Sequence, residues 1–242
     1  MPAATLKSWL KTFLENRGLY VRKIGGLARG ADLFIDLARL GFSTDGVVFD
    51  VGAHKGETAA LFKEVWPSAT VFSFEPVAEN HRALSRRVQG LTGVRCFHAA
   101  LGASAGTATI HLGSDSQTHR IDGNPDGAGG SSRTESVAVT TLDAIVAAER
   151  VSRIPLLKID AEGYEIPILE GARRTFEAGL VDWIFVEATL DPGDILHTPL
   201  ATLQTALGAH GFHLVALYDQ MIWNNPLRMA YANALFRRAE PR

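Results

Sequence analysis

From residue 47 onward, short apolar runs alternate with stretches of helical periodicity, and this pattern limits the chain to few folds. Six runs are predicted to be strands, because each is a short and largely apolar segment that suits a sheet covered on both faces. They are Val47–Phe49, Thr70–Phe74, Val94–Phe97, Pro155–Ile159, Trp183–Val186 and Phe212–Leu217. The helices predicted between them are Thr58–Val65, Ala78–Val88, Leu142–Ala148, Ile166–Ala178 and Leu200–Ala209. The alternation predicts an α/β fold with a doubly wound, mostly parallel sheet.

Two segments break this alternation. Ala108–Leu112 and Glu135–Val139 predict an inserted hairpin, joined by a loop rich in Gly, Ser and Asp. We assign residues 113–136 as a variable insertion whose polar side chains suit a lid over a hydroxyl-rich ligand, with a solvated loop as the alternative. Ala230–Phe236 follows a strand with no helix between them, which predicts an antiparallel C-terminal hairpin.

The first forty residues are predicted to be helical. Residues 6–14 place apolar side chains at helical spacing with lysines on the opposite face, and they lack the uninterrupted apolar stretch of a targeting segment. A second helix is predicted over Leu27–Leu40, where Gly41 supplies a C-terminal cap. We therefore divide the chain into an N-terminal helical extension, residues 1–42, and one α/β domain, residues 43–242.

Composition excludes several classes of protein. Hydrophobic residues make up 46% and charged residues 21%, which is typical of a globular chain and excludes wholesale disorder. No apolar run approaches the roughly 18 residues that a membrane-spanning helix needs. A net charge of −2 lacks the basic excess typical of nucleic-acid binding, and the single Cys96 excludes an internal disulfide. We expect a cytoplasmic protein that acts on a small-molecule or glycan acceptor, and the sequence leaves a homo-oligomer open.

A glycine-containing segment follows the first predicted strand. Residues 50–56, Asp-Val-Gly-Ala-His-Lys-Gly, open a helix at the place where a doubly wound sheet binds nucleotides. The segment lacks the Lys-Ser/Thr ending of a phosphate-binding loop and the first glycine of a dinucleotide motif. The carboxylate of Asp50 suits a cationic ligand better than a pyrophosphate. S-adenosylmethionine, with its ammonium and sulfonium groups, is such a ligand.

An acidic residue ends the second predicted strand. Glu75 lies nineteen positions after Gly56, and a carboxylate there can accept hydrogen bonds from both hydroxyls of a ribose. Together with Asp50 on the neighbouring strand, it outlines a site for an adenosine-bearing cofactor. The alternative is a glycine loop beside a helix-capping glutamate.

Five sequence blocks occur in one order along the chain. The blocks are Asp50-Val51-Gly52-Ala53-x-x-Gly56, Glu75-Pro76 with Asn80, Ala99-Ala100-Leu101-Gly102, Thr141-Leu142-Asp143 and Lys158-Ile159-Asp160-x-Glu162-Gly163-x-Glu165. Taken together they closely resemble the FkbM-type family of S-adenosylmethionine-dependent methyltransferases. The resemblance covers roughly residues 47–187 and extends more weakly to Phe236.

The resemblance implies a class I, Rossmann-like methyltransferase fold with a seven-stranded sheet and an antiparallel C-terminal hairpin. It also implies O-methylation of a hydroxyl on a sugar, a glycoside or a glycosylated natural product. The residues that would contact the cofactor are Asp50, Gly52, Ala53, His54 and Gly56 at its methionine end, Glu75 at its ribose, Ala100 and Leu101 at its adenine, Asp160 near the methyl group, and also Thr58 and Pro76.

A protonated hydroxyl is a poor nucleophile, so methyl transfer to it needs a base or a metal ion. Asp160 and Glu187 end neighbouring predicted strands, and either could be the base, or the pair could hold Mg²⁺. The residue after Glu187 is Ala188, whose side chain has no oxygen to serve as a second ligand, and this counts against a Mg²⁺ site. His197, in the loop after the fifth predicted strand, is a third candidate base. Alternatively, Asp160 only orients the cofactor, Glu187 caps a turn and His197 is solvated.

Two other classes of function remain open from the sequence. A nicotinamide-dependent oxidoreductase could use the same sheet, although the dinucleotide glycines are missing. A non-catalytic scaffold could retain the fold and the cofactor site, although it would have no need to keep Asp160 together with Glu75.

Overall fold

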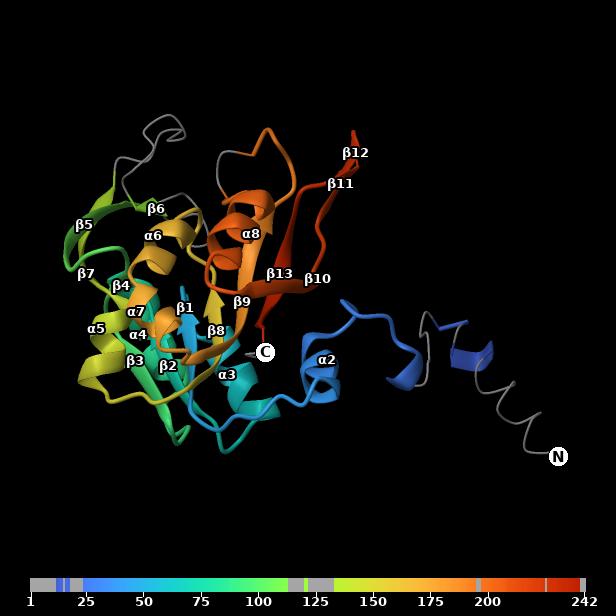
Figure 1. Ribbon diagram of the computed structural model, residues 1–242, viewed down its shortest axis with the longest axis horizontal. Helices are drawn as coiled ribbons and strands as arrows, with labels where there is room; N and C mark the ends of the chain where they lie inside the picture. Colours follow the sequence, from blue (N-terminus) through green and yellow to red (C-terminus); the bar gives the residue numbers. More distant parts are fainter. Residues whose placement is uncertain are drawn as a thin grey trace.

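The computed structural model describes residues 12–14, 16–17, 24–112, 120–121, 133–194, 197–224 and 226–239. At its centre lies a seven-stranded sheet in the order β10-β13-β9-β8-β1-β2-β3 (Figure 1). The strands are β1 Val47–Val51, β2 Thr70–Phe74, β3 Val94–Phe97, β8 Ile154–Ile159, β9 Val181–Thr189, β10 Phe212–Tyr218 and β13 Tyr231–Arg238. Strand β13 runs antiparallel to β9 and β10, and the other pairings are parallel, so the predicted α/β fold is confirmed.

The register of the parallel strands gathers their ends at one edge. Strand β1 pairs with β2 on one side and with β8 on the other, which makes it the switch point where a doubly wound sheet binds ligands. Val51 aligns with Phe74 and with Ile159, and Ile159 aligns with Val186. The residues that follow these four at the common edge are Gly52, Glu75, Asp160 and Glu187.

Helices cover both faces of the sheet. They are η1 Ile24–Gly26, α2 Leu33–Arg39, α3 Glu57–Val65, α4 Ala78–Arg87, α5 Leu142–Ala148, α6 Glu165–Glu170, α7 Arg173–Glu177 and α8 Leu200–Gly208. One core cluster joins the sheet to α5, α6, α7 and α8, and a second joins it to α2, α3 and α4. The alternating sides of the strands therefore both face apolar layers, which explains the continuous apolar runs in the sequence.

The prediction of one helix over residues 166–178 is wrong, because the chain forms α6 and α7 with a break at Gly171. A Cβ atom at position 171 would lie 2.0 Å from the carbonyl oxygen of Gly102, so only glycine allows this approach. The Gly171 carbonyl in turn accepts a hydrogen bond from the Asp143 amide at 3.0 Å. The helix is therefore interrupted where Gly171 contacts Gly102 and Asp143, which are distant in sequence.

Helix α2 belongs to the packing of the sheet. It begins at Leu33 rather than at the predicted Leu27, because the Asp32 side chain caps it by accepting from the Ile35 amide at 2.9 Å. The buried Asp36 carboxylate accepts a hydrogen bond from the Tyr218 hydroxyl of β10 at 3.0 Å. Most of the amphipathic helix predicted over residues 6–14 lies outside the described residues.

A smaller sheet stands beside the main one, in the order β4-β7-β5-β6. Its strands are β4 Ala100–Leu101, β5 Gly106–His111, β6 Arg120–Ile121 and β7 Thr134–Thr140. The antiparallel pairing of β5 with β7 confirms the predicted hairpin, while most of the predicted lid over residues 113–136 lies outside the described residues. A further hairpin, β11 Ile222–Asn224 and β12 Leu227–Met229, was not expected and projects from β10 and β13 (Figure 1).

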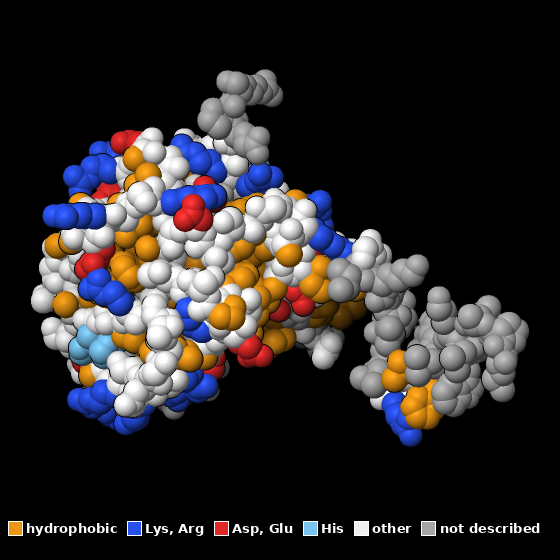
Figure 2. Space-filling view, turned by 90° about the horizontal axis from the view of Figure 1, so that it is seen from below, with side chains coloured by type: hydrophobic (Ala, Val, Ile, Leu, Met, Phe, Trp, Pro, Cys, Tyr) orange, Lys and Arg blue, Asp and Glu red, His pale blue; other side chains and the backbone are white. Residues whose placement is uncertain are grey.

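The described surface carries both signs of charge. Figure 2 shows Lys and Arg side chains at separate points of one face, interspersed with acidic and apolar ones. Among the described helices, none combines the length and the apolar character that crossing a membrane requires.

Candidate active site

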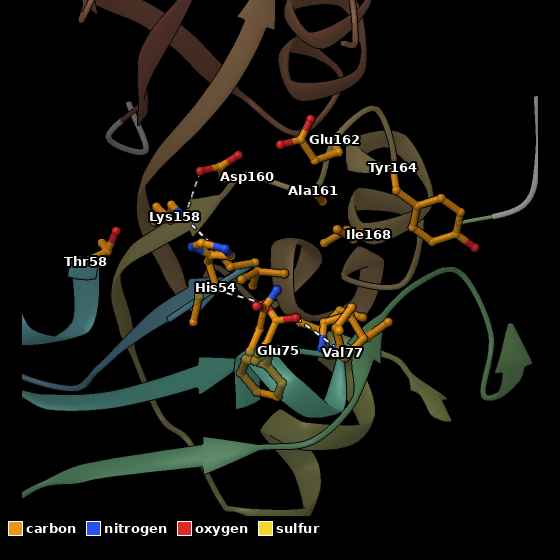
Figure 3. Close-up of a pocket in the computed structure, with 18 of the residues that line it drawn as sticks. His54, Thr58, Glu75, Val77, Lys158, Asp160, Ala161, Glu162, Tyr164 and Ile168 are labelled. Carbon is orange, nitrogen blue, oxygen red and sulfur yellow. Dashed lines mark hydrogen bonds and ion pairs between the residues drawn. The ribbon is translucent and has the colours of Figure 1, made fainter. Parts of the chain in front are cut away.

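A cavity of about 890 Å³ opens at the carboxyl ends of β1, β2, β8 and β9 (Figure 3). Its size is within the usual range for small-molecule sites. In Figure 3, Glu75 lies in the lower part of the view, and Asp160 and Glu162 lie above it, across the cavity. The predicted cofactor residues that line this cavity are Gly52, Ala53, His54, Thr58, Glu75, Pro76, Ala100, Leu101 and Asp160.

Glu75 is fixed by the backbone around it. Its Oε2 accepts from the His54 amide and its Oε1 from the Val77 amide, both at 2.9 Å. Only 5% of the residue is exposed, and this burial raises the pKa of Glu75 to about 7, although the hydrogen bonds lower it. The side chain thus presents a preorganised carboxylate beside the apolar walls formed by Ala100 and Leu101.

Two residues predicted to contact the cofactor lie behind the cavity wall instead. Asp50 is fully buried, and its Oδ1 lies 3.4 Å from the Lys158 Nζ. Gly56 has a φ of +87°, and a Cβ atom there would lie 2.8 Å from a methyl carbon of Leu84. Gly56 therefore allows α3 to pack against α4. The cation beside Asp50 is therefore the Lys158 ammonium group rather than a cationic ligand.

Lys158 connects the strand tips. Its Nζ lies 3.2 Å from Asp160 Oδ2 and donates to the Gly52 carbonyl oxygen at 3.0 Å, in addition to its contact with Asp50. Burial alone would lower the pKa of Lys158, but the carboxylates of Asp160 and Asp50 outweigh it and raise this pKa above its ordinary value. The ammonium stays charged and holds β1 and β8 in a fixed relation at the cavity floor.

The opposite end of the cavity brings together side chains from four segments of the chain. His197 Nε2 lies 3.3 Å from Glu187 Oε2 on β9 and 3.9 Å from Glu162 Oε2 in the turn after β8. His197 Nδ1 lies 2.7 Å from Asp194 Oδ2, and the imidazole stacks on the Tyr231 ring with centroids 5.1 Å apart. All of these side chains except Asp194 line the cavity.

The turn after β8 aims Glu162 at this cluster. Glu162 adopts a φ of +51°, which a non-glycine residue rarely does. Glu165 stabilises the turn, because its Oε1 accepts from the Ala161 amide at 3.1 Å and from the Gly163 amide at 3.2 Å. Its Oε2 accepts from the Thr198 hydroxyl, which ties the turn to the segment that carries His197.

Burial and mutual repulsion set the charge of this cluster. Burial and the Asp160 carboxylate raise the pKa of Glu162 to about 8 and that of Glu187 to about 7. Burial would lower the pKa of His197, but its hydrogen bond to Asp194 and the charge of Glu187 raise it. An arrangement of carboxylates that resist ionisation favours a proton or another cation between them.

The three predicted catalytic residues all line the cavity, but they do not form a single contacting group. Glu187 and His197 lie side by side, whereas Asp160 is held by Lys158. The sequence left open a Mg²⁺ ion between Asp160 and Glu187, whereas the described ligand atoms that lie within 4.8 Å of one another belong to Glu162, Glu187 and His197. Because Mg²⁺ prefers oxygen ligands and near-octahedral geometry, a group that includes an imidazole nitrogen fits that ion poorly.

Four residues of the site, Lys158, Glu162, Asp194 and Tyr231, have no role that the sequence predicts. A signal for Lys158 and Glu162 was present, because both are in the block that also contains Asp160. Tyr231 reaches the site only because β13 pairs with β9 and aligns it with Thr189, so no local pattern could have indicated it.

Known proteins are similar to this chain over most of the residues that line the cavity. Residues 50–214 match the model of the methyltransferase FkbM domain. Methyltransferase 1 of Beauveria bassiana is 25% identical over 189 residues, 71% of this chain and 74% of the relative. The hexuronic acid methyltransferase AglP of Haloferax volcanii is 26% identical over 158 residues, 62% of this chain and 60% of the relative. The crystal structure of a methyltransferase FkbM from Methylobacillus flagellatus has a similar fold, with a TM-score of 0.52 and 18% identity over 79% of this chain and 44% of that chain.

Proposed function

Since the chain belongs to the FkbM methyltransferase family, we propose that it is an S-adenosylmethionine-dependent O-methyltransferase acting on a hydroxyl of a sugar, a glycoside or a glycosylated natural product. One observation carries the proposal: a single cavity has a buried, preorganised carboxylate at one end and a cluster of proton-accepting side chains at the other. The first end suits a nucleoside, and the second suits an acceptor hydroxyl.

In this proposal the residues around β1 and β2 hold the cofactor. Glu75 accepts hydrogen bonds from the ribose hydroxyls, and Ala100 and Leu101 flank the adenine. Asp160, held by Lys158, faces the positive charge of the methionine end. When bound, S-adenosylmethionine supplies a methyl group activated by the sulfonium, so the protein mainly has to position the acceptor and exclude water.

The cluster at the other end takes up the acceptor proton. The bound cofactor would supply the methyl group to the acceptor oxygen, and side chains of the protein would take up the hydroxyl proton. Glu187, His197 and Asp160 are the proposed catalytic residues, because their lone pairs or charges line the wall where that proton must go. Glu162 is added to this set by its position.

A carbohydrate acceptor is supported by the relative from Haloferax volcanii, whose name specifies a hexuronic acid. Tyr231, which lines the acceptor end, offers a ring on which a sugar can stack. The cavity is also large enough to hold a second molecule beside a nucleoside.

A labelled-methyl transfer assay over a panel of sugars and glycosides tests this function. We expect transfer to at least one hydroxylated acceptor, and lost turnover with a folded protein in Asp160→Asn. We also expect S-adenosylhomocysteine, but not NADH, to raise the melting temperature, because only a ligand of the folded state stabilises it. Intact cofactor binding without transfer to any acceptor would favour a scaffold role instead.

A further inference from the structure

We propose that Glu162, Glu187 and His197 form a binding site for one divalent transition-metal ion at the acceptor end of the cavity. The site follows from where the three side chains lie, and only its role in catalysis rests on the proposed function. The three residues come from the turn after β8, from β9 and from the segment before α8. The fold therefore brings them together across 35 residues of sequence.

The spacing of the ligand atoms suits a shared ion. One carboxylate oxygen from each glutamate and one imidazole nitrogen lie within 4.8 Å of one another. Ligands at about 2.0–2.2 Å from a common ion are roughly 3–3.5 Å apart. The distance of 3.3 Å between His197 Nε2 and Glu187 Oε2 already meets this, and Glu162 Oε2 lies 3.9 Å from the same nitrogen, somewhat beyond it.

The imidazole is oriented for coordination by a residue outside the ligand group. Asp194 accepts from His197 Nδ1 at 2.7 Å and from the His197 amide at 3.3 Å. With the proton on Nδ1, the lone pair of Nε2 faces the two glutamates. A carboxylate that fixes the tautomer of a histidine ligand in this way is the usual support of a metal-bound imidazole. The Tyr231 ring stacks on the imidazole and limits its tilt.

The glutamates need a cation that the neighbouring ammonium group does not supply. The Lys158 ammonium contacts Asp50 and Asp160 rather than Glu162 or Glu187. The side chains of Glu162, Glu187 and His197 are 28%, 15% and 14% exposed, so water screens their repulsion only in part. A divalent ion would neutralise both carboxylates at once.

The chemistry of the ligands selects the class of ion. One imidazole with two carboxylates suits Mn²⁺, Co²⁺ or Zn²⁺, whereas Mg²⁺ prefers oxygen ligands alone. The three residues line the cavity, so coordination positions would face the acceptor. An ion there would lower the pKa of an acceptor hydroxyl that it binds, and with Glu187 and His197 engaged as ligands the proton would pass to Asp160, which lies outside the ligand group.

Isothermal titration of the chelator-treated full chain with MnCl₂, ZnCl₂ and MgCl₂ tests the site without cofactor or acceptor. We expect one Mn²⁺ or Zn²⁺ per chain, bound at least tenfold more tightly than Mg²⁺. Glu187→Gln and His197→Gln should each weaken binding at least tenfold. The matched controls Glu170→Gln, at the exposed end of α6, and His213→Gln, exposed on β10, should bind as the wild type does.

Thermal unfolding without metal shows whether each variant is folded. If Glu187→Gln or His197→Gln does not fold, Glu162→Gln replaces it, and this variant should also bind the metal at least tenfold more weakly. In crystals soaked in MnCl₂, we expect an anomalous peak between the three side chains. Absence of saturable binding, equal affinity for Mg²⁺, or unchanged binding in the site variants would overturn the proposal. Because the titration involves no methyl transfer, a negative transfer assay would leave this result intact, and the reverse is also true.

Discussion

At the scale of single residues, the charges at the strand tips decide how the cavity responds to pH and to substitution. Glu75 and Lys158 are both buried, and each is held by neighbours from a different strand or loop. Buried ionisable groups cost free energy unless they are paired or protonated. Glu75 favours its protonated form, because burial raises its pKa, whereas Lys158 is paired with carboxylates. Each residue leads to a prediction about stability.

Glu75 should make the folded state less stable as the pH rises. Its pKa is about 7 in the folded chain and 4.5 in the reference state, so between these values the folded state keeps a proton that the unfolded state releases. The variant Glu75→Gln has no ionisable group at this position, so its stability should not fall with pH in this way. Relative to the wild type, the free energy of unfolding of the variant should therefore increase by roughly 2 kcal/mol between pH 5 and pH 8, which means that the variant gains relative stability.

Guanidinium denaturation of both proteins at the two pH values measures this difference. The hydrogen bond that glutamine cannot accept weakens the variant at both pH values and so largely cancels in the comparison. A difference that does not change with pH would show that Glu75 titrates near its ordinary value.

Lys158→Met should be strongly destabilising, because it leaves the buried Asp50 carboxylate without its cation. Removing one partner of a buried pair costs about 3–5 kcal/mol. The double variant Asp50→Asn with Lys158→Met removes both charges and should recover much of this loss. Chemical denaturation of the two single variants and the double variant checks the coupling, and additive effects would contradict it.

The residues of the proposed cofactor end are predictable from the sequence to the extent that they lie at strand tips. Glu75 and Asp160 follow strands that the sequence indicates clearly, and both reach the cavity. Asp50 also lies on such a strand, but alternation turns its side chain into the protein, where Lys158 meets it. Which way a strand-tip side chain points depends on its neighbours in the sheet, and the sequence of one strand does not contain that information.

At the scale of elements, the errors of prediction concern boundaries set by distant contacts. Strand β9 was expected to end at Val186 but continues to Thr189, because β13 pairs with it from Trp183 to Thr189. Glu187 therefore lies inside a rigid strand rather than at a loose end. Local periodicity predicts that a strand exists, while its length depends on the partner strand.

The break between α6 and α7 leads to a prediction at this scale. Gly171→Ala should destabilise the protein by more than about 2 kcal/mol, because the added methyl group would overlap the Gly102 carbonyl next to β4. Gly208→Ala, at the end of α8, is the matched control, since nothing lies within 4 Å of a Cβ atom there.

Urea denaturation should show a large loss for the first variant and little change, or a gain of up to about 1 kcal/mol, for the second. Equal effects of the two substitutions would mean that the close approach at Gly171 relaxes at no cost.

At the scale of the whole molecule, helix α2 raises the question of where the domain begins. The sequence predicts an extension that ends at residue 42, but Leu37 is fully buried in the same apolar cluster as α3 and β10. Phe34 and Phe42 also contact the ring of Trp66, with centroids 5.2 and 4.7 Å apart. We therefore expect α2 to unfold together with the sheet.

Leu37→Ala tests this expectation. It should lower the free energy of unfolding by about 2–5 kcal/mol, because it creates a cavity in the core. The loss should appear in one transition, monitored both by far-ultraviolet circular dichroism and by tryptophan fluorescence. A separate early transition, or an unchanged main one, would instead make α2 an independently folding extension.

The order of the chain divides the cavity in a way that matters for protein engineering. The residues that we propose at the nucleoside come from positions 51–101, and those that we propose at the acceptor come from positions 158–231, a range that also includes Asp160 at the methionine end of the cofactor. Two halves of a gene could therefore be recombined within the inserted segment, with one half retained for the cofactor and the other taken from a relative with a different acceptor. The joint between them would depend on the pairing of β1 with β8 and on the Lys158 bridge beneath it.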